Sequence, residues 1–279
     1  MRLRRPRFEE GMVSQVVNYV DNQRENARVT KGKGQYTHLS SLIDFCPRMQ
    51  VLARDHNVQP ITRGATGGHR VMWRIGRAVE AHIREQYIRG TDWNNVLGTW
   101  KCNCGQIKHE NTHYDHKWRS CKSCRSKPRN YVEMGLLDHE HKVVGSPDMV
   151  LFTGTAGYLP VEIKSMNAEQ FATLEAPVPD HVFQVLGYQK LLRVSGYQVH
   201  PNAILIYCVK DFRWGSPYKE FTIDPRNFPH VVQQIDEAFL RAKAIHETDG
   251  LPPRMTACGS PTDTRPKQCP LLAQCFMRG

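Results

Sequence analysis

Two mostly apolar runs decide the fold: Gly145-Ser146-Pro147-Asp148-Met149-Val150-Leu151-Phe152 and Tyr158-Leu159-Pro160-Val161-Glu162-Ile163-Lys164. A glycine-containing turn at 154–157 separates them, so the pattern predicts a β-hairpin. Side chains alternate between the two faces of a strand, which places Glu162 and Lys164 on one face and turns Ile163 toward the core. We expect the hairpin to bring Asp148 alongside Glu162.

This convergence of two carboxylates and a lysine suits Mg²⁺ or Mn²⁺, which prefer oxygen ligands and keep open positions for water and phosphate. The lysine suits a water or phosphate oxygen beside them. The alternative is an exposed strand in which Glu162 and Lys164 are an ordinary polar alternation. Because Asp148 stands on the partner strand, the pattern favours the metal site.

The composition points to a polyanionic partner. The 279 residues include 38 Lys and Arg against 27 Asp and Glu, which gives a net charge of +11 and a pI of about 9.3. Such an excess suits nucleic acid, and the alternative is a basic protein without such a partner. A membrane partner is disfavoured, because no basic amphipathic helix and no apolar run near the ~18 residues of a spanning helix occurs.

The cysteines point to metal rather than disulfides. The nine cysteines are an odd number and cluster tightly, and the basic N-terminus is not followed by the apolar segment of a secretory signal. Without an export signal, clustered cysteines favour metal binding over a disulfide framework. We therefore expect a cytoplasmic protein.

Hydrophobic periodicity and composition divide the chain into five segments. They are a basic arm with a short helix (1–37), a mainly helical part (38–98), a Cys- and His-rich insertion (99–129), the core (130–247) and a Cys-rich tail (248–279). The order of helix, strands, helix, two strands and helix predicts an α/β or α+β fold, a central sheet flanked by helices.

Individual elements follow from the same patterns. Ser40 or Ser41 is expected to cap a helix that runs to Leu52, and Pro47 should start a new helix within it. The remaining expected elements are helices at 12–27, 70–88, 180–195 and 226–246, strands within 131–165 and at 202–209 and 216–223, and loops at 57–69 and 166–176.

Four further residues on predicted helices are site candidates. Gln184 and Tyr188 are four apart and share one helix face, which can look onto the metal site; the alternative is a surface Gln and a half-buried Tyr. In helix 70–88, Glu80 and His82 are candidate metal ligands. They point about 200° apart at ~100° per residue, so only one of them can serve.

The insertion carries two cysteine pairs, Cys102-Asn103-Cys104 and Cys121-Lys122-Ser123-Cys124, separated by sixteen residues. Four thiolates from two such knuckles form a closed tetrahedral Zn²⁺ site. The histidines at 109, 113 and 116 are possible substitutes or surface residues. The insertion is also basic and can hold a DNA backbone through phosphate contacts, or it is only a structural flap.

Five cysteines remain. Cys208 lies in an almost wholly apolar predicted strand and is interpreted as a small core residue. Cys258, Cys269 and Cys275 occupy a tail with no core of its own, and with Cys46 they can hold an iron–sulfur cluster that links the two ends of the chain. Spacing alone does not choose between zinc, a cluster and free thiols.

Together these motifs resemble the PD-(D/E)XK nuclease superfamily, in its RecB-like branch with the Q-x3-Y motif. The matching residues, in order, are Pro147-Asp148, Glu162-Ile163-Lys164 and Gln184 with Tyr188. The segments 41–48 and 267–275 resemble the cysteine segments of the iron–sulfur members, which include CRISPR-associated nucleases and related phage exonucleases. Ten residues lie between Cys258 and Cys269, where that branch has a short C-x2-C.

The resemblance implies a restriction-endonuclease-like fold with a zinc-ribbon insertion and a [4Fe-4S] cap. It implies that Asp148, Glu162, the carbonyl of Ile163 and Glu80 hold one or two Mg²⁺ or Mn²⁺ ions. Glu80 is carried over because it stands four residues after Gly76, where the family often has a His. Lys164 would orient or deprotonate the attacking water, and Gln184 and Tyr188 would position the DNA strand.

The function expected from the resemblance is a metal-dependent deoxyribonuclease, an exonuclease acting on single strands or DNA ends in recombination, repair, phage DNA processing or CRISPR adaptation. The alternative is a nuclease-fold DNA-binding subunit of a larger recombination or replication assembly in which cleavage is secondary. Intact Asp148, Glu162 and Lys164 favour the enzyme.

Overall fold

A computed structural model describes residues 36–43, 45–56, 67–90, 92–209, 216–265, 269 and 271–277, with only the backbone described at 54–56 and 67–73. The helix expected at 12–27, the rest of the N-terminal arm up to residue 35 and residues 57–66 of the loop expected at 57–69 lie outside these residues, and the last three positions of that expected loop are helical. The described chain forms two compact units, one from 46–77 and 249–265 with 269 and 271–277, the other from 36–43, 45 and 78–248 with its gaps.

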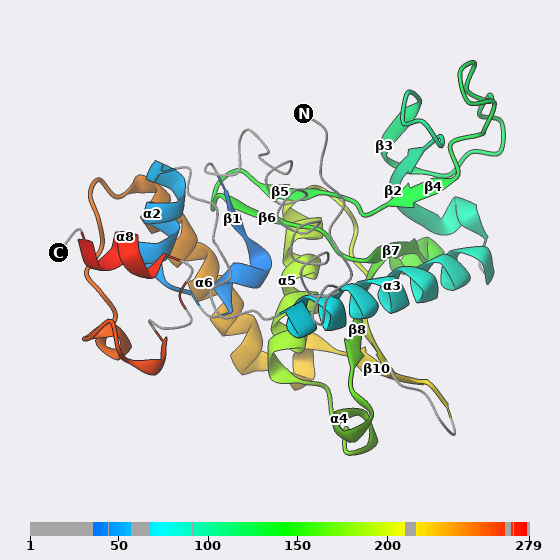
Figure 1. The fold of residues 1–279 in the computed structure, drawn as a ribbon. Coiled ribbons are helices and arrows are strands. Elements are labelled where there is room, and N and C mark those ends of the chain that lie inside the picture. The colour runs from blue at the N-terminus through cyan, green and yellow to red at the C-terminus, as the bar shows by residue number, and fades with distance from the viewer. Residues whose placement is uncertain are drawn as a thin grey trace, which may run out of the picture. The chain divides into compact units, whose positions relative to one another are not determined.

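The larger unit is built on a mixed sheet flanked by helices, as predicted. The strands run in the order β10-β9-β8-β7-β2-β3, and β4 also pairs with β2 (Figure 1). Only β8 and β9 are parallel; the other neighbours are antiparallel. The strands are β2 (Val96–Lys101), β3 (Lys108–His113), β4 (Asn130–Val132), β7 (Met149–Phe152), β8 (Tyr158–Met166), β9 (Ala203–Val209) and β10 (Tyr218–Ile223).

The predicted hairpin is present as β7 and β8. Met149 pairs with Val161, so the preceding Asp148 lies opposite Glu162. The turn passes through a short 3-10 helix, η4 (Gly154–Ala156), and ends at Gly157 with φ of 95°. A Cβ at this glycine would lie 2.4 Å from the carbonyl oxygen of Gln198, so both the left-handed backbone and the close approach require glycine.

The two faces of this sheet pack against different helices. One face carries Val150, Leu205 and Tyr207 into a cluster with Val185 and Leu191 of α5 (Pro179–Val194). The other carries Met149, Val161, Ile163, Ile206 and Cys208 into a second cluster with Ile83 and Ile88 of α3 (Gly67–Gly90). The strands near the hairpin are nearly all apolar because both of their faces are covered. Cys208 is a buried core residue, as predicted.

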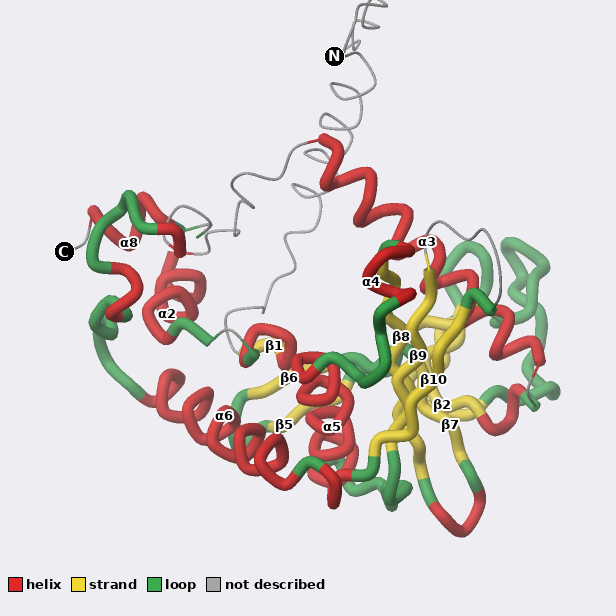
Figure 2. The backbone as a smooth tube through the Cα atoms, turned by 90° about the horizontal axis from the view of Figure 1, so that it is seen from below, coloured by secondary structure: helices red, strands yellow, loops and turns green. Residues whose placement is uncertain are grey.

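A small second sheet, in the order β1-β6-β5, packs beside α5 and α6 (Pro229–Glu247), as Figure 2 shows. Its strands are β1 (Thr37–His38), β5 (Leu136–Asp138) and β6 (Val143–Gly145). Gly145, the last residue of β6, packs directly against α5. A Cβ at this position would lie 2.9 Å from both Leu191 and Tyr188, so the close approach requires glycine. The close approach brings the segment that leads to Asp148 onto the helix that carries Gln184.

Three expectations for secondary structure were wrong in part. The segment after Ser40 forms only the 3-10 turn η2 (Leu39–Leu42), preceded by His38 without a side-chain cap, whereas Pro47 does start α2 (Pro47–His56). The expected loop at 166–176 contains a short helix, α4 (Ala168–Ala172), which Asn167 caps by accepting from the amide of Gln170. The last long helix begins three residues later than expected, after η5 (Pro225–Asn227).

The smaller unit joins α2 to the C-terminal tail, which forms η6 (Thr256–Cys258) and α8 (Leu272–Met277). The guanidinium of Arg48 donates to the carbonyl oxygens of Pro252 at 2.8 Å and Cys275 at 3.0 Å. These bonds hold the tail against α2, although Pro252 and Cys275 follow Arg48 by 204 and 227 positions in the sequence.

Within the described ranges, none of the helices is long and apolar enough to cross a membrane.

Candidate active site and cysteine sites

The candidate active site lies where β8 continues past the start of β7. Asp148 Oδ2 accepts a hydrogen bond of 2.7 Å from the backbone N–H of Ile163. Glu80 Oε1, on α3, accepts from the N–H of Ser165 at 3.1 Å and from its hydroxyl at 2.8 Å. Two carboxylates therefore occupy the strand edge that β7 leaves unpaired. The N–H and C=O of one residue point to the same strand edge, so the carbonyl of Ile163 also points there.

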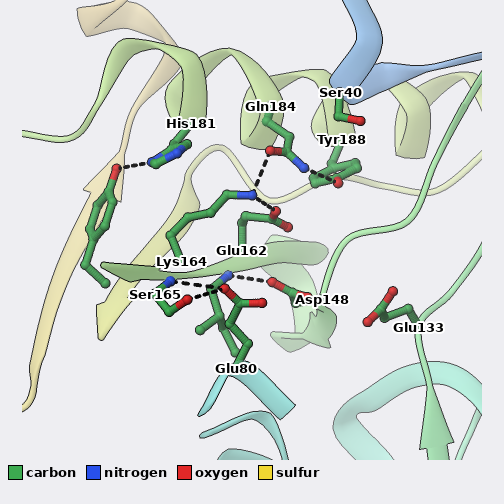
Figure 3. A network of polar contacts seen from close by, with 12 residues as sticks. Ser40, Glu80, Glu133, Asp148, Glu162, Lys164, Ser165, His181, Gln184 and Tyr188 are labelled. Atoms are coloured by element: carbon green, nitrogen blue, oxygen red, sulfur yellow. Dashed lines mark hydrogen bonds and ion pairs between the residues drawn. The ribbon is translucent and has the colours of Figure 1, made fainter. Parts of the chain in front are cut away.

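Glu162 and Lys164 project together from β8 toward α5 (Figure 3). Lys164 Nζ donates to Glu162 Oε1 at 2.6 Å and to Gln184 Oε1 at 2.9 Å. The amide of Gln184 in turn donates to the hydroxyl of Tyr188 at 2.7 Å. The structure therefore brings Gln184 and Tyr188 onto the lysine, and both are buried rather than on the surface.

Burial dominates the electrostatics of this site. It raises the pKa of Asp148 well above the ordinary value, and repulsion from Glu162 acts in the same direction. Burial also raises the pKa of Glu162, although the charge of Lys164 and its hydrogen bond oppose the effect. A nearby cation favours the ionised form of both carboxyls. A further positive charge beside them would therefore stabilise the ionised site more than Lys164 does alone.

The donor set fits a divalent cation. Glu162 Oε2 is buried and has no hydrogen-bond partner among the residues that the structure describes. Leaving a buried charged acceptor without a partner costs at least about 1–3 kcal/mol, which a cation beside it would offset. The neighbouring donors from Asp148, Glu80 and the carbonyl of Ile163 are all oxygens, the ligand type that Mg²⁺ and Mn²⁺ prefer.

The two candidate ligands on α3 separate clearly. Glu80 is half-buried and hydrogen-bonded to β8, whereas His82 is exposed. The structure thus places Glu80, and not His82, beside the hairpin.

Two charged residues of the site were missed in the sequence. Arg84 on α3 forms an ion pair with Glu133, and its Nη1 lies 3.7 Å from Asp148 Oδ1. Arg84 stands four residues after Glu80, so helical spacing places it on the same helix face and could have identified it. Glu133 follows the short strand β4 and has no comparable signal.

The cysteines of the insertion converge. The ligand atoms of Cys102, Cys104, Cys121 and Cys124 all lie within 4.8 Å of one another, and Sγ of Cys104 is 3.5 Å from that of Cys102 and 3.6 Å from that of Cys121. Zn–S bonds of about 2.3 Å in a tetrahedron separate sulfurs by about 3.8 Å. The four thiols therefore fit a single zinc ion.

Hydrogen-bond donors around these sulfurs favour the thiolate form that binds metal. The N–H of Ile107 donates to Cys102 Sγ at 3.2 Å. The hydroxyl of Ser126, followed by the backbone amides of Ser126 and Cys104, lowers the pKa of Cys124 to about 5. The thiolate is therefore favoured at Cys102 and Cys124, whereas hydrogen bonds with the neighbouring cysteines raise the pKa of Cys104.

The three histidines of the insertion have other partners. His109 stacks on Trp118 with ring centroids 4.0 Å apart. His113 Nε2 is 3.1 Å from the hydroxyl of Tyr158 in β8, and His116 packs edge-on against Tyr114. Among the described residues, only cysteines make up the tight group of possible ligands.

The insertion also shares an aromatic core with the residues that flank it. Trp100 and Tyr114 are buried, and Trp93, Trp118 and Tyr131 pack against them. The insertion contains hardly any aliphatic residues, but β2 and β3 make it the continuation of the main sheet. Aromatic contacts replace the aliphatic ones.

The remaining four cysteines meet in the smaller unit. Cys46, Cys258, Cys269 and Cys275 line one pocket with the apolar residues Met49, Leu52, Leu271, Leu272 and Phe276. Burial raises the pKa of Cys46 and of Cys258. Their sulfurs do not form a group as tight as the one in the insertion. The pocket gathers four cysteines, which is the number of ligands that a [4Fe-4S] cluster takes.

Comparisons with known proteins give only remote similarities. No known family model matches the sequence, and no curated protein matches it. Among solved structures, the alkaline exonuclease LHK-Exo of Laribacter hongkongensis matches with a TM-score of 0.44 and 18% identity, over 81% of this chain and 94% of that chain. Its complex with dAMP matches with a TM-score of 0.41 and 17% identity, over 77% and 90%. The structure of SSO0001 matches with a TM-score of 0.42 and 13% identity, over 84% and 88%.

Proposed function

We propose that this protein is a Mg²⁺- or Mn²⁺-dependent deoxyribonuclease that hydrolyses phosphodiester bonds. The observation that carries the proposal is the buried Oε2 of Glu162, which has no partner in the described structure while Asp148 and Lys164 stand beside it. A buried carboxylate of this kind, next to further oxygen donors and a lysine, suits a hydrolytic metal centre.

In this proposal Asp148, Glu162, Glu80 and the carbonyl of Ile163 hold the metal. When bound, the metal activates water and neutralises the charge that develops on the phosphate and the leaving oxygen. Lys164 orients or deprotonates the attacking water and stabilises the developing charge. Its Nζ is held between Glu162 and Gln184, so the side chain is already in position before the substrate binds.

Gln184 and Tyr188 are proposed to position the DNA strand near the metal. Their link to Lys164 supports a role in the site, because the Gln184 side chain accepts from the lysine and donates to Tyr188. The substrate is proposed to be a single strand or a DNA end. The net charge of +11 supports a polyanionic substrate.

The cysteine groups are proposed to be structural. Cys102, Cys104, Cys121 and Cys124 hold Zn²⁺, and Cys46, Cys258, Cys269 and Cys275 hold a [4Fe-4S] cluster. Hydrolysis needs no electron transfer, so a cluster here stabilises the smaller unit. Iron, sulfide and zinc analysis of the purified protein, with its visible absorbance, tests both assignments. Zinc alone at two ions per chain would replace the cluster with a second zinc site.

The nuclease assignment is tested with Glu162→Gln, which keeps the side-chain volume. End-labelled single- and double-stranded DNA is incubated with Mg²⁺ or Mn²⁺ and with neither. We expect the rate of cleavage by the variant to fall by about 10³-fold or more, which corresponds to a loss of about 4 kcal/mol in transition-state stabilisation. The matched control is Glu220→Gln, an exposed glutamate on β10 of the same sheet. Cleavage by the Glu162 variant at the wild-type rate would contradict the proposed nuclease site.

A further inference from the structure

Arg84 stands between two carboxylates at the edge of the candidate metal site. Its Nη1 forms an ion pair and a hydrogen bond with Glu133 Oε1 and lies 3.7 Å from Asp148 Oδ1. At 3.7 Å the second contact is an ion pair without a hydrogen bond, so the interaction of the guanidinium with Glu133 is the stronger one. Figure 3 shows the Glu133 carboxylate near Asp148, on the side away from Lys164.

The position of Glu133 is set by β4. The preceding Tyr131 lays its ring on Gly98 of β2, so closely that a Cβ at Gly98 would be 2.2 Å from the ring. The same ring faces the Arg84 guanidinium, whose carbon lies 5.8 Å from the ring centroid. Tyr131 and Glu133 therefore hold Arg84 from two sides; Tyr131 lies on β4 and Glu133 directly follows this strand, which leads out of the cysteine insertion.

The charges around the hairpin explain why this matters. Counted as formal charges, Glu80, Glu133, Asp148 and Glu162 are four negative groups, and Arg84 and Lys164 are two positive ones, which leaves a charge of −2. One divalent cation neutralises that charge. If Glu133 were neutral, the surplus would fall to −1, and Arg84 would keep Asp148 as its nearest anion.

We propose that Glu133 is a positioning residue that draws Arg84 away from Asp148, so that Asp148 remains available to a divalent cation. The inference rests on the proposed metal-dependent function. The side chains of Arg84 and Asp148 are only 19% and 17% exposed, so water and salt screen their attraction weakly. Without Glu133, Arg84 competes with the cation for the same carboxylate oxygen.

A double-mutant cycle tests this competition through Mn²⁺ affinity, measured by titration calorimetry on the full chain. Glu133→Gln is expected to weaken Mn²⁺ binding by about 10- to 100-fold, the usual effect of removing a partner of a metal ligand. Adding Arg84→Gln to that variant removes the competitor, so the double variant is expected to return to within a few-fold of wild type. Glu133→Asp keeps the charge and should retain most of the affinity.

Glu85→Gln and Arg89→Gln are the matched controls, because this exposed ion pair lies on the same helix. Neither should change Mn²⁺ affinity. If the double variant binds Mn²⁺ as weakly as Glu133→Gln, or if Glu133→Gln binds as well as wild type, Glu133 has only a structural role and the inference is wrong. If wild type itself binds no Mn²⁺, the proposed function fails first. Circular dichroism confirms that each variant is folded before titration.

Discussion

The carboxylate site and the cysteine insertion are two candidate metal sites built in opposite ways. The four thiols come from two knuckles within 23 residues of chain and lie on loops around an aromatic core. The oxygen donors come from α3, the start of β7 and β8, which are spread over more than 80 residues and packed between two apolar clusters. The same sheet carries both, since β2 pairs with β3 along one edge and with β7 and then β4 along the other.

The difference lies in what holds each site in shape without its ion. Around the hairpin, buried apolar side chains fix the backbone. They hold the carboxylates in place without an ion, although burying these groups costs desolvation free energy. In the insertion the thiols stand on turns that have aromatic neighbours but little aliphatic support, so we expect the binding of an ion to supply folding free energy. We expect the oxygen site to outlast the loss of its ion and the cysteine site to unfold locally.

Zinc removal should give the largest effect. Structural Zn²⁺ contributes about 10–16 kcal/mol of apparent binding free energy in isolated zinc-finger peptides, so Cys121→Ser should unfold much of the region from 102 to 129. Hydrogen exchange followed by mass spectrometry should show lost protection there, while β8 and β9 stay protected. Removal of Mg²⁺ alone should leave both regions protected. Unchanged exchange in the Cys121 variant would show that the aromatic core holds the insertion without metal.

Lys164→Met should give the next largest effect, and only on the carboxylate side of the comparison. Loss of a positioned proton-transfer group lowers the rate by about 10²–10⁴-fold, which can be measured as kcat on single-stranded DNA. Lys190→Met on α5 is the control, because its partner Asp236 lies on α6, away from the hairpin. Equal losses in both variants would assign the lysine effect to general charge rather than to the site.

Gly98→Ala probes the strand that joins the two regions. The added Cβ would lie 2.2 Å from the Tyr131 ring, so this ring must move and push on β4, and overpacking of this kind costs about 1–3 kcal/mol. Denaturant unfolding measures the loss, and Mn²⁺ affinity should fall with it because Glu133 moves. Gly135→Ala is the control, since nothing lies within 4 Å of its Cβ. Lost stability with unchanged Mn²⁺ affinity would mean that the two regions are not coupled through β4.

The smallest expected effect concerns pH and His181. Burial, with a contribution from the charge of Lys164, lowers the pKa of His181 to about 4. In the unfolded chain it is about 6.5, so unfolding takes up a proton between these values. This contribution to stability is present above pH 6.5 and is lost as the pH falls toward 4.

His181→Asn should therefore flatten part of the acid loss in the free energy of unfolding between pH 6.5 and 4.5. The neutral ring fits its environment, in which the Tyr207 hydroxyl accepts from the Val178 amide and lies 3.0 Å from His181 Nδ1. The exposed His230 is the control position. An acid transition identical in wild type and in the His181 variant would exclude His181 as its source.

Much of the architecture was predictable because it depends on short-range periodicity. Two apolar runs around a glycine-containing turn located the hairpin, helical spacing located α5 with Gln184 and Tyr188 on one face, and two short knuckles located the four thiols that meet. The fold class followed from the order of these elements. Errors arose at ends and short helices, such as η2 and α4, where a single cap or one turn decides.

The surroundings of the site were not predictable in the same way. Amino-acid order determined which chemical groups are present and which of them share a strand or helix face, because those relations span only a few residues. Only the tertiary structure decided three features of the site. The pairing of β8 with β7 ends before Ile163, Glu162 Oε2 is buried without a partner among the described residues, and Glu133 reaches Arg84 beside Asp148. Burial and charge separation depend on segments that meet across long stretches of chain, and local patterns do not encode those distances.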